Sequence, residues 1–375
     1  MRNVVECISE NIKKYRRKCG MTQAELAAML GYSEKAISKW ECGKGTPPTE
    51  LLPKLARCLE TSIDRLMSED GNGEMLFLGI DGGGTKTDFA LADKNGKLIR
   101  RVILGASNPN DVGLPEAQSV LKSGIIEVCG EYPMKSISAF AGLAGGSSKE
   151  NEQKIYDFLS NFGFASLANG EDAENAVSAG LDGSDGVAVI MGTGSVVYAK
   201  QGDELYRMGG YGFLLGDEGS GFSIGRDVIH AALRYEDGSG EDTLLYKYVK
   251  EKCGSEAVFE SIDGFYRGGK REIAQYAPLA FRAYSKGDRL ATDILTKNIG
   301  ELAALIQSAA KKVQGSSTRV VICGGLVSES ETIVDILSGA LSNDSRKYHI
   351  EVCKKPMVWG ALRLAGMPCE TVEWR

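Results

Sequence analysis

The sequence has few residues of several kinds, and each shortage narrows what the protein can be. Only 2 histidines occur among 375 residues, which argues against catalysis by a histidine nucleophile. None of the 9 cysteines forms a C-x-x-C pair, so we expect reduced, buried thiols and no zinc or redox site. No apolar run approaches the ~20 residues that span a bilayer. The charged start MRNVVECISENIKKYRR lacks the apolar core of a signal peptide, so we expect a cytoplasmic protein without a membrane partner.

Glycine is abundant, and charge is unevenly distributed. The chain holds 47 glycines, many of them in short clusters behind apolar runs, where tight backbone turns are needed. Its length predicts two or three domains. Positions 1–70 hold 12 Lys and Arg against 10 Asp and Glu, whereas the whole chain has a net charge of −6. Any DNA contact is therefore expected at the front of the chain.

Four short helical patterns follow one another within positions 1–70. The first carries Ile8, Ile12 and Tyr15 on one face. The second opens with Thr22 and Glu25, the spacing of a capping box. After a Gly-Tyr turn, the third opens at Ser33, and a fourth follows the Pro-Pro pair. Helix, short turn, helix is a DNA-reading unit, whose second helix enters the major groove.

The string T-Q-A-E-L-A-A-M-L-G-Y-S-E-K-A-I-S-K-W-E-C-G-K-G-T-P-P resembles the phage-repressor-like (Xre-type) helix-turn-helix family. The resemblance implies an all-α DNA-binding domain over residues 1–69, acting on an operator as a homodimer. Carried over by position, the DNA contacts are Gln23, Ser33, Glu34, Lys35, Ser38 and Lys39. Taken outside the motif, Glu34 and Lys35 are more typical of a solvated helix face than of DNA contacts.

A polar, Gly-rich stretch at residues 70–75 reads as a linker, and an internal duplication follows it. The apolar run L-F-L-G-I leads into D-G-G-G-T-K-T and a second extended run. The same plan recurs near the middle of the chain, where M-G-T-G-S follows another apolar run. Each glycine turn joins strand to strand, which excludes a Rossmann fingerprint or a P-loop. One G-x-G-T motif is weak evidence, but two such motifs at corresponding positions predict two similar α/β lobes. We expect lobe 1 over residues 76–185 and lobe 2 over residues 186–375. A C-terminal helix is expected to return to lobe 1.

A third element, R-V-V-I-C-G-G-L-V-S-E-S-E, reads as a strand, a Gly-Gly pair and a helix start. Together the three elements resemble the actin-like ATPase superfamily over about residues 76–375. That resemblance implies an α/β two-lobed kinase that uses ATP, with two phosphate loops and an adenosine loop. The implied nucleotide contacts are Gly82, Gly83, Gly84, Thr85, Lys86, Gly192, Thr193, Gly194, Ser195, Gly324 and Gly325. Lys86 reads equally as a solvent-facing strand residue.

Longer strings narrow the resemblance. G-I-D-G-G-G-T-K-T, A-S-N-P-N, A-G-L-A-G-G, E-D-A-E-N-A and G-G-Y-G-F-L-L-G-D-E-G-S-G-F-S-I-G stand in the order found in the N-acetylglucosamine kinase / BadF–BcrA ATPase family. The resemblance implies that Asp172 is the catalytic base and that Asp81 orients Mg²⁺ through water. Taken alone, Asp172 is more typical of a helix N-cap than of a catalytic base.

The same resemblance implies a site for an amino sugar. Its contacts would be Asn108, Gly145, Gly146, Asp172, Thr193, Gly210, Tyr211, Gly212 and Asp217. Two positions depart from the family pattern and leave the preference at the sugar 2-position open. Tyr211 stands where relatives often carry Trp, and Ser147 stands where they carry Asp.

We therefore expect an ATP-dependent kinase of N-acetylglucosamine, glucosamine or N-acetylmuramic acid, fused to a DNA-binding domain and responsive to the sugar. One alternative is a sugar-sensing transcriptional repressor with little kinase activity. Another is a BadF-type activator ATPase, which would need cysteines for an iron–sulfur cluster, although the two glycine turns and the sugar-contact strings contain no cysteine.

Overall fold

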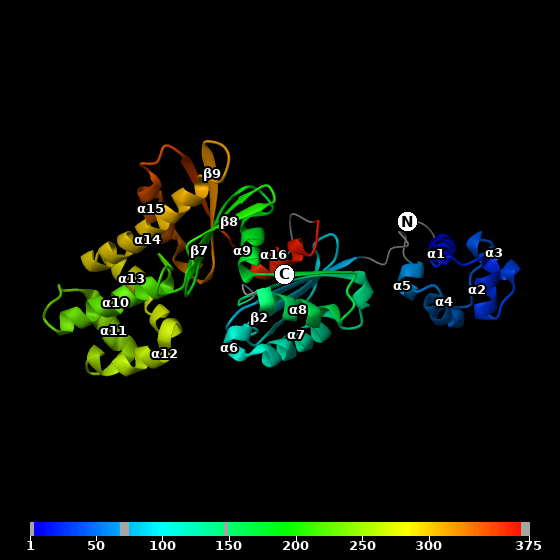
Figure 1. Ribbon diagram of the computed structural model, residues 1–375, viewed down its shortest axis with the longest axis horizontal. Helices are drawn as coiled ribbons and strands as arrows, with labels where there is room; N and C mark the ends of the chain where they lie inside the picture. Colours follow the sequence, from blue (N-terminus) through cyan, green and yellow to red (C-terminus); the bar gives the residue numbers. More distant parts are fainter. Residues whose placement is uncertain (1–3, 68–74, 146–148, 369–375) are drawn as a thin grey trace. The chain divides into compact units, whose positions relative to one another are not determined.

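The structure is a computed structural model, and it describes residues 4–67, 75–145 and 149–368 (Figure 1). The expected linker lies almost wholly outside these ranges, as do Gly146 and Ser147. Three hydrophobic cores are separate from one another, one in the N-terminal helices and one around each of two β-sheets.

The N-terminal part is all-helical, as expected. Its elements are α1 (Val4–Lys18), α2 (Gln23–Leu30), α3 (Glu34–Glu41), the 3-10 turn η1 (Thr49–Leu51), α4 (Leu52–Cys58) and α5 (Ile63–Met67). The capping box at the start of α2 is confirmed, because the Glu25 N–H donates to Thr22 Oγ1 at 3.2 Å and Thr22 N–H donates to Glu25 Oε2 at 2.7 Å. Ser33 caps α3 through the N–H of Ala36. The short helix α5 was not expected, and it brings Leu66 into the core.

The first sheet has the strand order β3-β2-β1-β4-β5. Its strands are β1 (Leu76–Gly82), β2 (Thr87–Ala92), β3 (Leu98–Leu104), β4 (Ile137–Leu143) and β5 (Ser166–Gly170). Strands β1, β2 and β3 form an antiparallel meander, whereas β4 and β5 run parallel to β1. The connections contain α6 (Pro109–Val112), α7 (Leu114–Cys129), the turn η2 (Met134–Ser136) and α8 (Lys149–Ser160). Helix α7 packs on β2 and β3, and α8 packs on β5.

The second sheet repeats this plan with the order β10-β9-β6-β7-β8. Its strands are β6 (Gly186–Met191), β7 (Ser195–Gln201), β8 (Glu204–Met208), β9 (Ser317–Cys323) and β10 (Lys347–Val352). Here too the first three strands are antiparallel and the last two run parallel. Strand β6 takes the central place that β1 takes in the first sheet, so the duplication predicted from the two glycine turns is confirmed.

The remaining helices of the described residues follow strand β5. They are α9 (Asp172–Leu181), α10 (Gly221–Glu236), α11 (Leu244–Cys253), η3 (Val258–Ser261), α12 (Ile262–Ala274), α13 (Ala277–Tyr284), α14 (Arg289–Ala310), η4 (Gly325–Glu329), α15 (Ser330–Leu341) and α16 (Met357–Leu364). Helix α14 packs on β6, β7 and β8, and α15 packs on β10. Helix α12 bends at Gly269, whose φ of 59° is not helical.

The chain forms two compact units and passes between them twice. It enters the second unit between Glu171 and Asp172 and leaves it between Ala361 and Leu362. We expected the lobe boundary at 185/186. The division falls earlier because α9 packs on β6 and β9 and thereby belongs with the second sheet.

The close packing of α16 on α9 gives a testable prediction. A Cβ at Gly360 would overlap the backbone carbonyl of Asn175 and lie 2.7 Å from the backbone nitrogen of Ala179. We expect Gly360→Ala to destabilise the second unit by about 1–3 kcal/mol, because helix backbone cannot yield as a side chain can. Calorimetry of the full chain would measure the shift in melting temperature.

The matched control is Gly300→Ala, also within a helix. A Cβ at Gly300 meets no atom within 4 Å, so this change should stabilise α14 by about 0.5–1 kcal/mol. Equal effects from both substitutions would contradict the packing argument.

Candidate functional site

The first glycine turn joins β1 to β2 in the first unit. The N–H of Gly83 donates to the carbonyl of Lys86 at 2.9 Å and closes the turn. A Cβ at Gly82 would overlap the side chains of Leu143 and Ser107, so only glycine fits there. Thr85 and Lys86 are exposed, and Gly83 and Gly84 are half-buried. The turn therefore presents the side-chain donors of Thr85 and Lys86 to solvent, as a phosphate-binding loop requires.

A polar cluster lies next to this turn. The N–H of Ser107 donates to the carbonyl of Gly83 at 3.1 Å, and the hydroxyl of Thr87 donates to Ser107 Oγ at 2.8 Å. These bonds tie the A-S-N-P-N string to the glycine turn. Asn108 follows directly and caps the short helix α6 through the N–H of Asn110.

Asn108 also meets the predicted sugar loop. A Cβ at Gly145, whose φ is +79°, would overlap Asn108 Oδ1 and lie 2.8 Å from Asn110 Nδ2. Asn151 Nδ2 donates to the carbonyl of Gly145 at 3.3 Å and to Asn110 Oδ1 at 3.2 Å. Amide groups, which both donate and accept, suit sugar hydroxyls. Sequence reasoning missed Asn110, although it ends the quoted string, and Asn151, for which no motif gave a signal.

Asp172 lies at a junction between elements. Strand β5 ends at Gly170, and Asp172 is the first residue of α9. Its side chain is exposed, whereas that of Glu171 is half-buried. An exposed carboxylate at a strand-to-helix junction is able to approach a substrate.

The second glycine turn joins β6 to β7 in the second unit. The N–H of Gly192 donates to the carbonyl of Gly194 at 2.9 Å. The turn also receives the start of α10, because the N–H groups of Gly221 and Phe222 donate to the carbonyls of Gly192 and Thr193 at 2.8 and 3.1 Å. Thr193 is exposed. Ser195 is buried, and its hydroxyl donates to the carbonyl of Glu218 at 2.7 Å.

The predicted adenosine loop packs directly on this turn. Gly324 has a φ of +106°, and a Cβ there would lie 2.9 Å from the backbone carbon of Met191, so glycine is required. A Cβ at Gly192 would lie 3.9 Å from the Gly325 nitrogen. The structure therefore brings together two motifs that stand far apart in the sequence, Gly192-Thr193 and Gly324-Gly325.

Two thiols stand side by side at the base of the adenosine loop. Cys323 ends β9, and the N–H of Cys353 donates to the carbonyl of Ile322 at 2.8 Å. The neighbouring Cys323 thiol lowers the pKa of Cys353 below the ordinary thiol value. The neighbouring Cys353 thiol and burial raise the pKa of Cys323.

The predicted sugar-contacting loop of the second unit lies between β8 and α10. Tyr211 is 67% exposed and flanked by Gly210 and Gly212, which have φ values of +70° and +86°. A largely exposed aromatic ring is available to cover the apolar face of a sugar. Asp217 is buried, with a left-handed φ of 63°, and its Oδ2 accepts a hydrogen bond from Lys270 Nζ at 2.7 Å. Lys270 was not identified from the sequence.

The fit of Mg²⁺ depends on Asp81, at the end of β1. Among the described residues, no group of three His, Cys, Asp or Glu side chains could hold a metal ion by itself. Mg²⁺ in phosphoryl-transfer sites keeps several waters and uses one or two carboxylates together with substrate phosphates. One half-buried carboxylate beside a glycine turn fits that kind of site.

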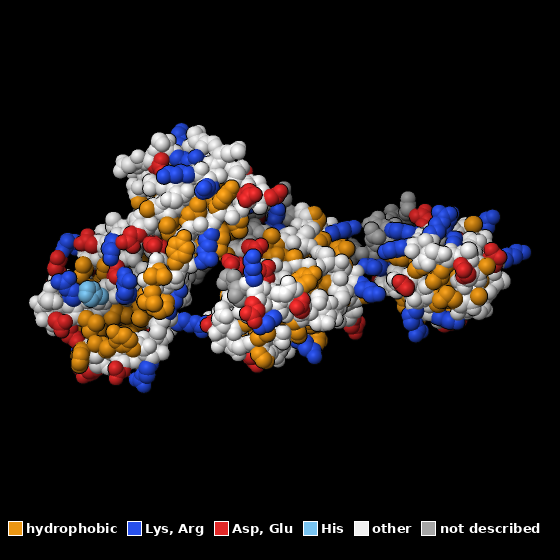
Figure 2. Space-filling view, viewed as in Figure 1, with side chains coloured by type: hydrophobic (Ala, Val, Ile, Leu, Met, Phe, Trp, Pro, Cys, Tyr) orange, Lys and Arg blue, Asp and Glu red, His pale blue; other side chains and the backbone are white. Residues whose placement is uncertain are grey.

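The helix-turn-helix presents most of the predicted DNA contacts to solvent. Ser33, Glu34, Lys35 and Lys39 are exposed, and Ser38 is half-buried. Figure 2 shows Lys and Arg side chains spread over the visible face of this domain. Gln23 differs from the rest, because its Nε2 donates to Glu41 Oε2 at 2.8 Å. That bond uses one of the two N–H donors of the amide.

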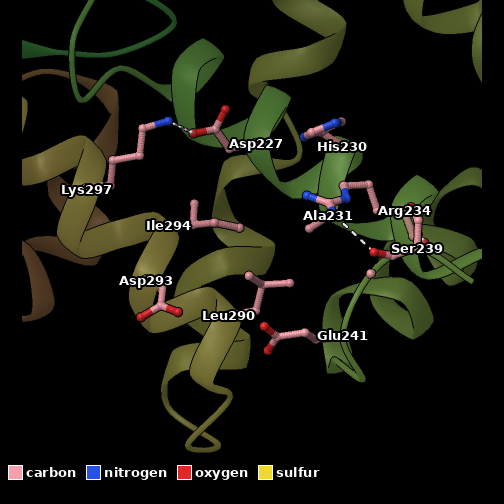
Figure 3. Close-up of a pocket in the computed structure, with 11 residues that line it drawn as sticks. Asp227, His230, Ala231, Arg234, Ser239, Glu241, Leu290, Asp293, Ile294 and Lys297 are labelled. Carbon is pink, nitrogen blue, oxygen red and sulfur yellow. Dashed lines mark hydrogen bonds and ion pairs between the residues drawn. The ribbon is translucent and has the colours of Figure 1, made fainter.

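A pocket of about 410 Å³ lies elsewhere in the second unit, between α10 and α14 (Figure 3). None of the predicted site residues lines it. Its charged side chains pair within the protein, since Lys297 lies 3.3 Å from Asp227 and Arg234 Nη2 donates to the carbonyl of Ser239 at 3.0 Å. The pocket therefore adds nothing to the candidate site.

Comparison with known proteins assigns a family model to each of the two parts of the chain. Residues 78–362 match the model of the BadF/BadG/BcrA/BcrD ATPase family, and residues 12–66 match a helix-turn-helix model. An N-acetylmuramic acid/N-acetylglucosamine kinase of Clostridium acetobutylicum is 31% identical over 302 residues, which cover 78% of this chain and 99% of that protein.

A solved structure and a regulator complete the comparison. A structure from Chromobacterium violaceum, described as a candidate N-acetylglucosamine kinase, superposes with a TM-score of 0.64 at 25% identity, covering 78% of this chain and 99% of its own. The HTH-type transcriptional activator BcrR of Enterococcus faecalis is 40% identical over 60 residues, covering 16% of this chain and 29% of that protein. No helix in the described part of the chain is long and apolar enough to cross a membrane.

Proposed function

Because the chain belongs to the BadF/BadG/BcrA/BcrD ATPase family and carries an N-terminal helix-turn-helix domain, we propose that it is an ATP-dependent amino-sugar kinase that also binds DNA. The observation that carries the kinase proposal is the pair of glycine turns at equivalent positions of two sheets with the same strand order. Each turn is closed by a backbone hydrogen bond of 2.9 Å and leaves polar groups exposed. The kinase relatives named above support the amino sugar as acceptor.

Each residue of the proposed site has a role in phosphoryl transfer from ATP to the sugar. Asp172 accepts the proton of the attacking sugar hydroxyl, whose oxygen forms a bond to the γ-phosphorus while the bond to the ADP oxygen breaks. The glycine turns and the exposed Thr85, Lys86 and Thr193 bind phosphate oxygens. Mg²⁺, held through water by Asp81, would neutralise phosphate charge. Asn108, Gly145, Tyr211 and Asp217 orient the sugar.

A substrate panel tests this proposal. The wild-type protein is incubated with ATP, Mg²⁺ and, in turn, N-acetylglucosamine, glucosamine, N-acetylmuramic acid and glucose, and ADP release is measured. We expect turnover with at least one of the three amino sugars and much less with glucose. A protein that binds an amino sugar without forming ADP would be a sensor, and a coloured, iron-containing protein would point to the activator ATPases.

The exposed recognition helix supports the DNA-binding half of the proposal. We expect Lys39→Ala to weaken operator binding by about 1–3 kcal/mol, because a cationic contact to DNA is lost. Gel-shift titration at fixed salt measures this loss, and the rate of ADP release should not change. Lys122→Ala, which removes an exposed charge from helix α7, is the control and should bind DNA as the wild type does. Loss of both activities in Lys39→Ala would indicate misfolding instead.

We further propose a homodimer that reads a two-fold operator, with DNA affinity that responds to the sugar. The support is the fusion of the two domains in one chain. Operator affinity measured with and without saturating sugar and nucleotide would test the response. Light scattering of the free protein would test the dimer.

A further inference from the structure

An ion pair that no sequence motif contained lies directly on the second glycine turn. Lys270 Nζ is 2.7 Å from Asp217 Oδ2, and the Asp217 side chain is only 4% exposed. A Cβ at Gly194 would lie 2.8 Å from that nitrogen and 2.9 Å from that oxygen. The pair is therefore in contact with the loop proposed to bind phosphate, and all three residues belong to the second unit.

The local backbone is shaped to place both partners. Asp217 takes a left-handed φ of 63°, which is uncommon for a residue other than glycine. Gly268 and Gly269 come just before Lys270, and Gly269 breaks the helical geometry of α12 with a φ of 59° and a ψ of −148°. Two glycines inside a helix lower its stability, so we expect the bend at this place to have a compensating role. The bend turns the chain just before Lys270.

We propose that Lys270 is a positioning residue that holds the Asp217 carboxylate against the Gly194 turn, and so couples the sugar-contacting loop to the phosphate-binding loop. A buried carboxylate needs a compensating positive charge and a fixed donor, and Lys270 supplies both. Without it, the Asp217 carboxylate would lose the donor that fixes its position and would turn toward water, and its hydrogen bond to the sugar would be lost. The inference rests on the proposed function, because it takes Asp217 as a sugar contact.

The test compares two dissociation constants, so that it does not depend on turnover. Calorimetric titration of the full chain gives the affinity for N-acetylglucosamine and, separately, for ADP. We expect Lys270→Met to weaken sugar binding about tenfold or more, the usual loss for a hydrogen bond to a charged group, and to change ADP binding less than about twofold. Lys270→Arg should restore most of the sugar affinity because it keeps the charge and donors.

A double-mutant cycle decides whether Lys270 acts through Asp217. If it does, Lys270→Met combined with Asp217→Asn loses no more sugar affinity than Asp217→Asn alone. Additive losses, or a loss of ADP affinity equal to the loss of sugar affinity, would overturn the inference, because Lys270 would then act on the phosphates or on the fold.

The control pair lies in the same unit. Lys297 is paired with Asp227 at 3.3 Å, in the pocket that contains none of the site residues, and Lys297→Met should leave both affinities unchanged. The two proposals fail separately. An inactive wild type that still binds the sugar would refute the kinase, whereas unchanged sugar binding by Lys270→Met in an active enzyme would refute the role of Lys270.

Discussion

Asp172→Asn is expected to lower kcat for sugar phosphorylation by about 10²–10⁴-fold, the usual contribution of a general base, while sugar binding changes little. The substitution keeps the size and hydrogen-bonding shape of the side chain but removes its ability to accept the hydroxyl proton. Asp172 is exposed at the first position of α9, so the folded structure should persist. Steady-state ADP release and calorimetric sugar binding would measure the two effects.

The neighbouring carboxylate provides the control. Glu171→Gln removes an equal charge one residue earlier, and we expect kcat to fall much less than in Asp172→Asn. Retained activity in Asp172→Asn together with a loss in Glu171→Gln would assign the base to Glu171. If Asp172 serves only to stabilise the start of α9, Asp172→Asn should leave both the melting temperature and kcat nearly unchanged, since asparagine is as good a cap as aspartate.

Glu41→Ala is expected to destabilise the helix-turn-helix domain by about 3–5 kcal/mol, the usual cost of removing one partner of a buried ion pair. Glu41 Oε1 and Oε2 accept hydrogen bonds from Arg16 at 2.6 and 2.9 Å, and Gln23 adds a third bond. The Glu41 side chain is 1% exposed and that of Arg16 10%. The substitution would leave the guanidinium without its carboxylate, although Arg16 Nη1 would still donate to the Met21 carbonyl.

Hydrogen exchange of the full-length protein measures this effect locally. Residues 4–67 should lose protection in Glu41→Ala, operator binding should fall, and ADP release should stay near the wild-type rate. A matched variant replaces both partners, as Arg16→Met with Glu41→Leu, and should recover most of the stability because no buried charge is left unpaired. Protection in Glu41→Ala equal to that of the wild type would show that the pair contributes nothing.

The same pair predicts how the domain responds to acid. Burial acts to raise the pKa of Glu41, but the hydrogen bonds from Arg16 and Gln23 outweigh it, and the pKa lies below the ordinary glutamate value. A lowered pKa in the folded state means that the stabilisation is present above the ordinary pKa of about 4.3. It is lost as the pH falls through the lowered value.

Local sequence signals predicted the helix-turn-helix well, because its caps and core positions are set by residues three or four apart. Thr22, Glu25 and Ser33 cap as expected, and Ile8, Ile12 and Tyr15 are buried together. The partner of Gln23 was not predictable, because Glu41 lies 18 residues away and on a different helix.

The duplicated sheets were predictable because each glycine turn sits between two apolar runs, and the spacing repeats. The long-range polar contacts were not. Lys270 lies 53 residues after Asp217. It is on helix α12, whose bend at Gly269 was not predicted by any sequence pattern. Asn151 reaches Asn110 across 41 residues. Such contacts depend on how helices and strands pack against one another, and the hydrophobic periodicity of the sequence does not predict that packing.

The two glycine turns take the same place in their sheets but differ in their charged residues, and this difference bears on how a ligand is oriented. The alignment that matches the glycines of the two turns pairs Asp81 with Met191 and Lys86 with Val196. A polyphosphate would meet polar groups at either turn. In the first copy a carboxylate and an ammonium belong to the loop sequence itself, whereas the second turn is contacted by Asp217 and Lys270 from outside its own sequence. Polar groups common to both turns would set how tightly the phosphates are held, and the different charges at the two turns would set the direction in which the phosphate chain lies.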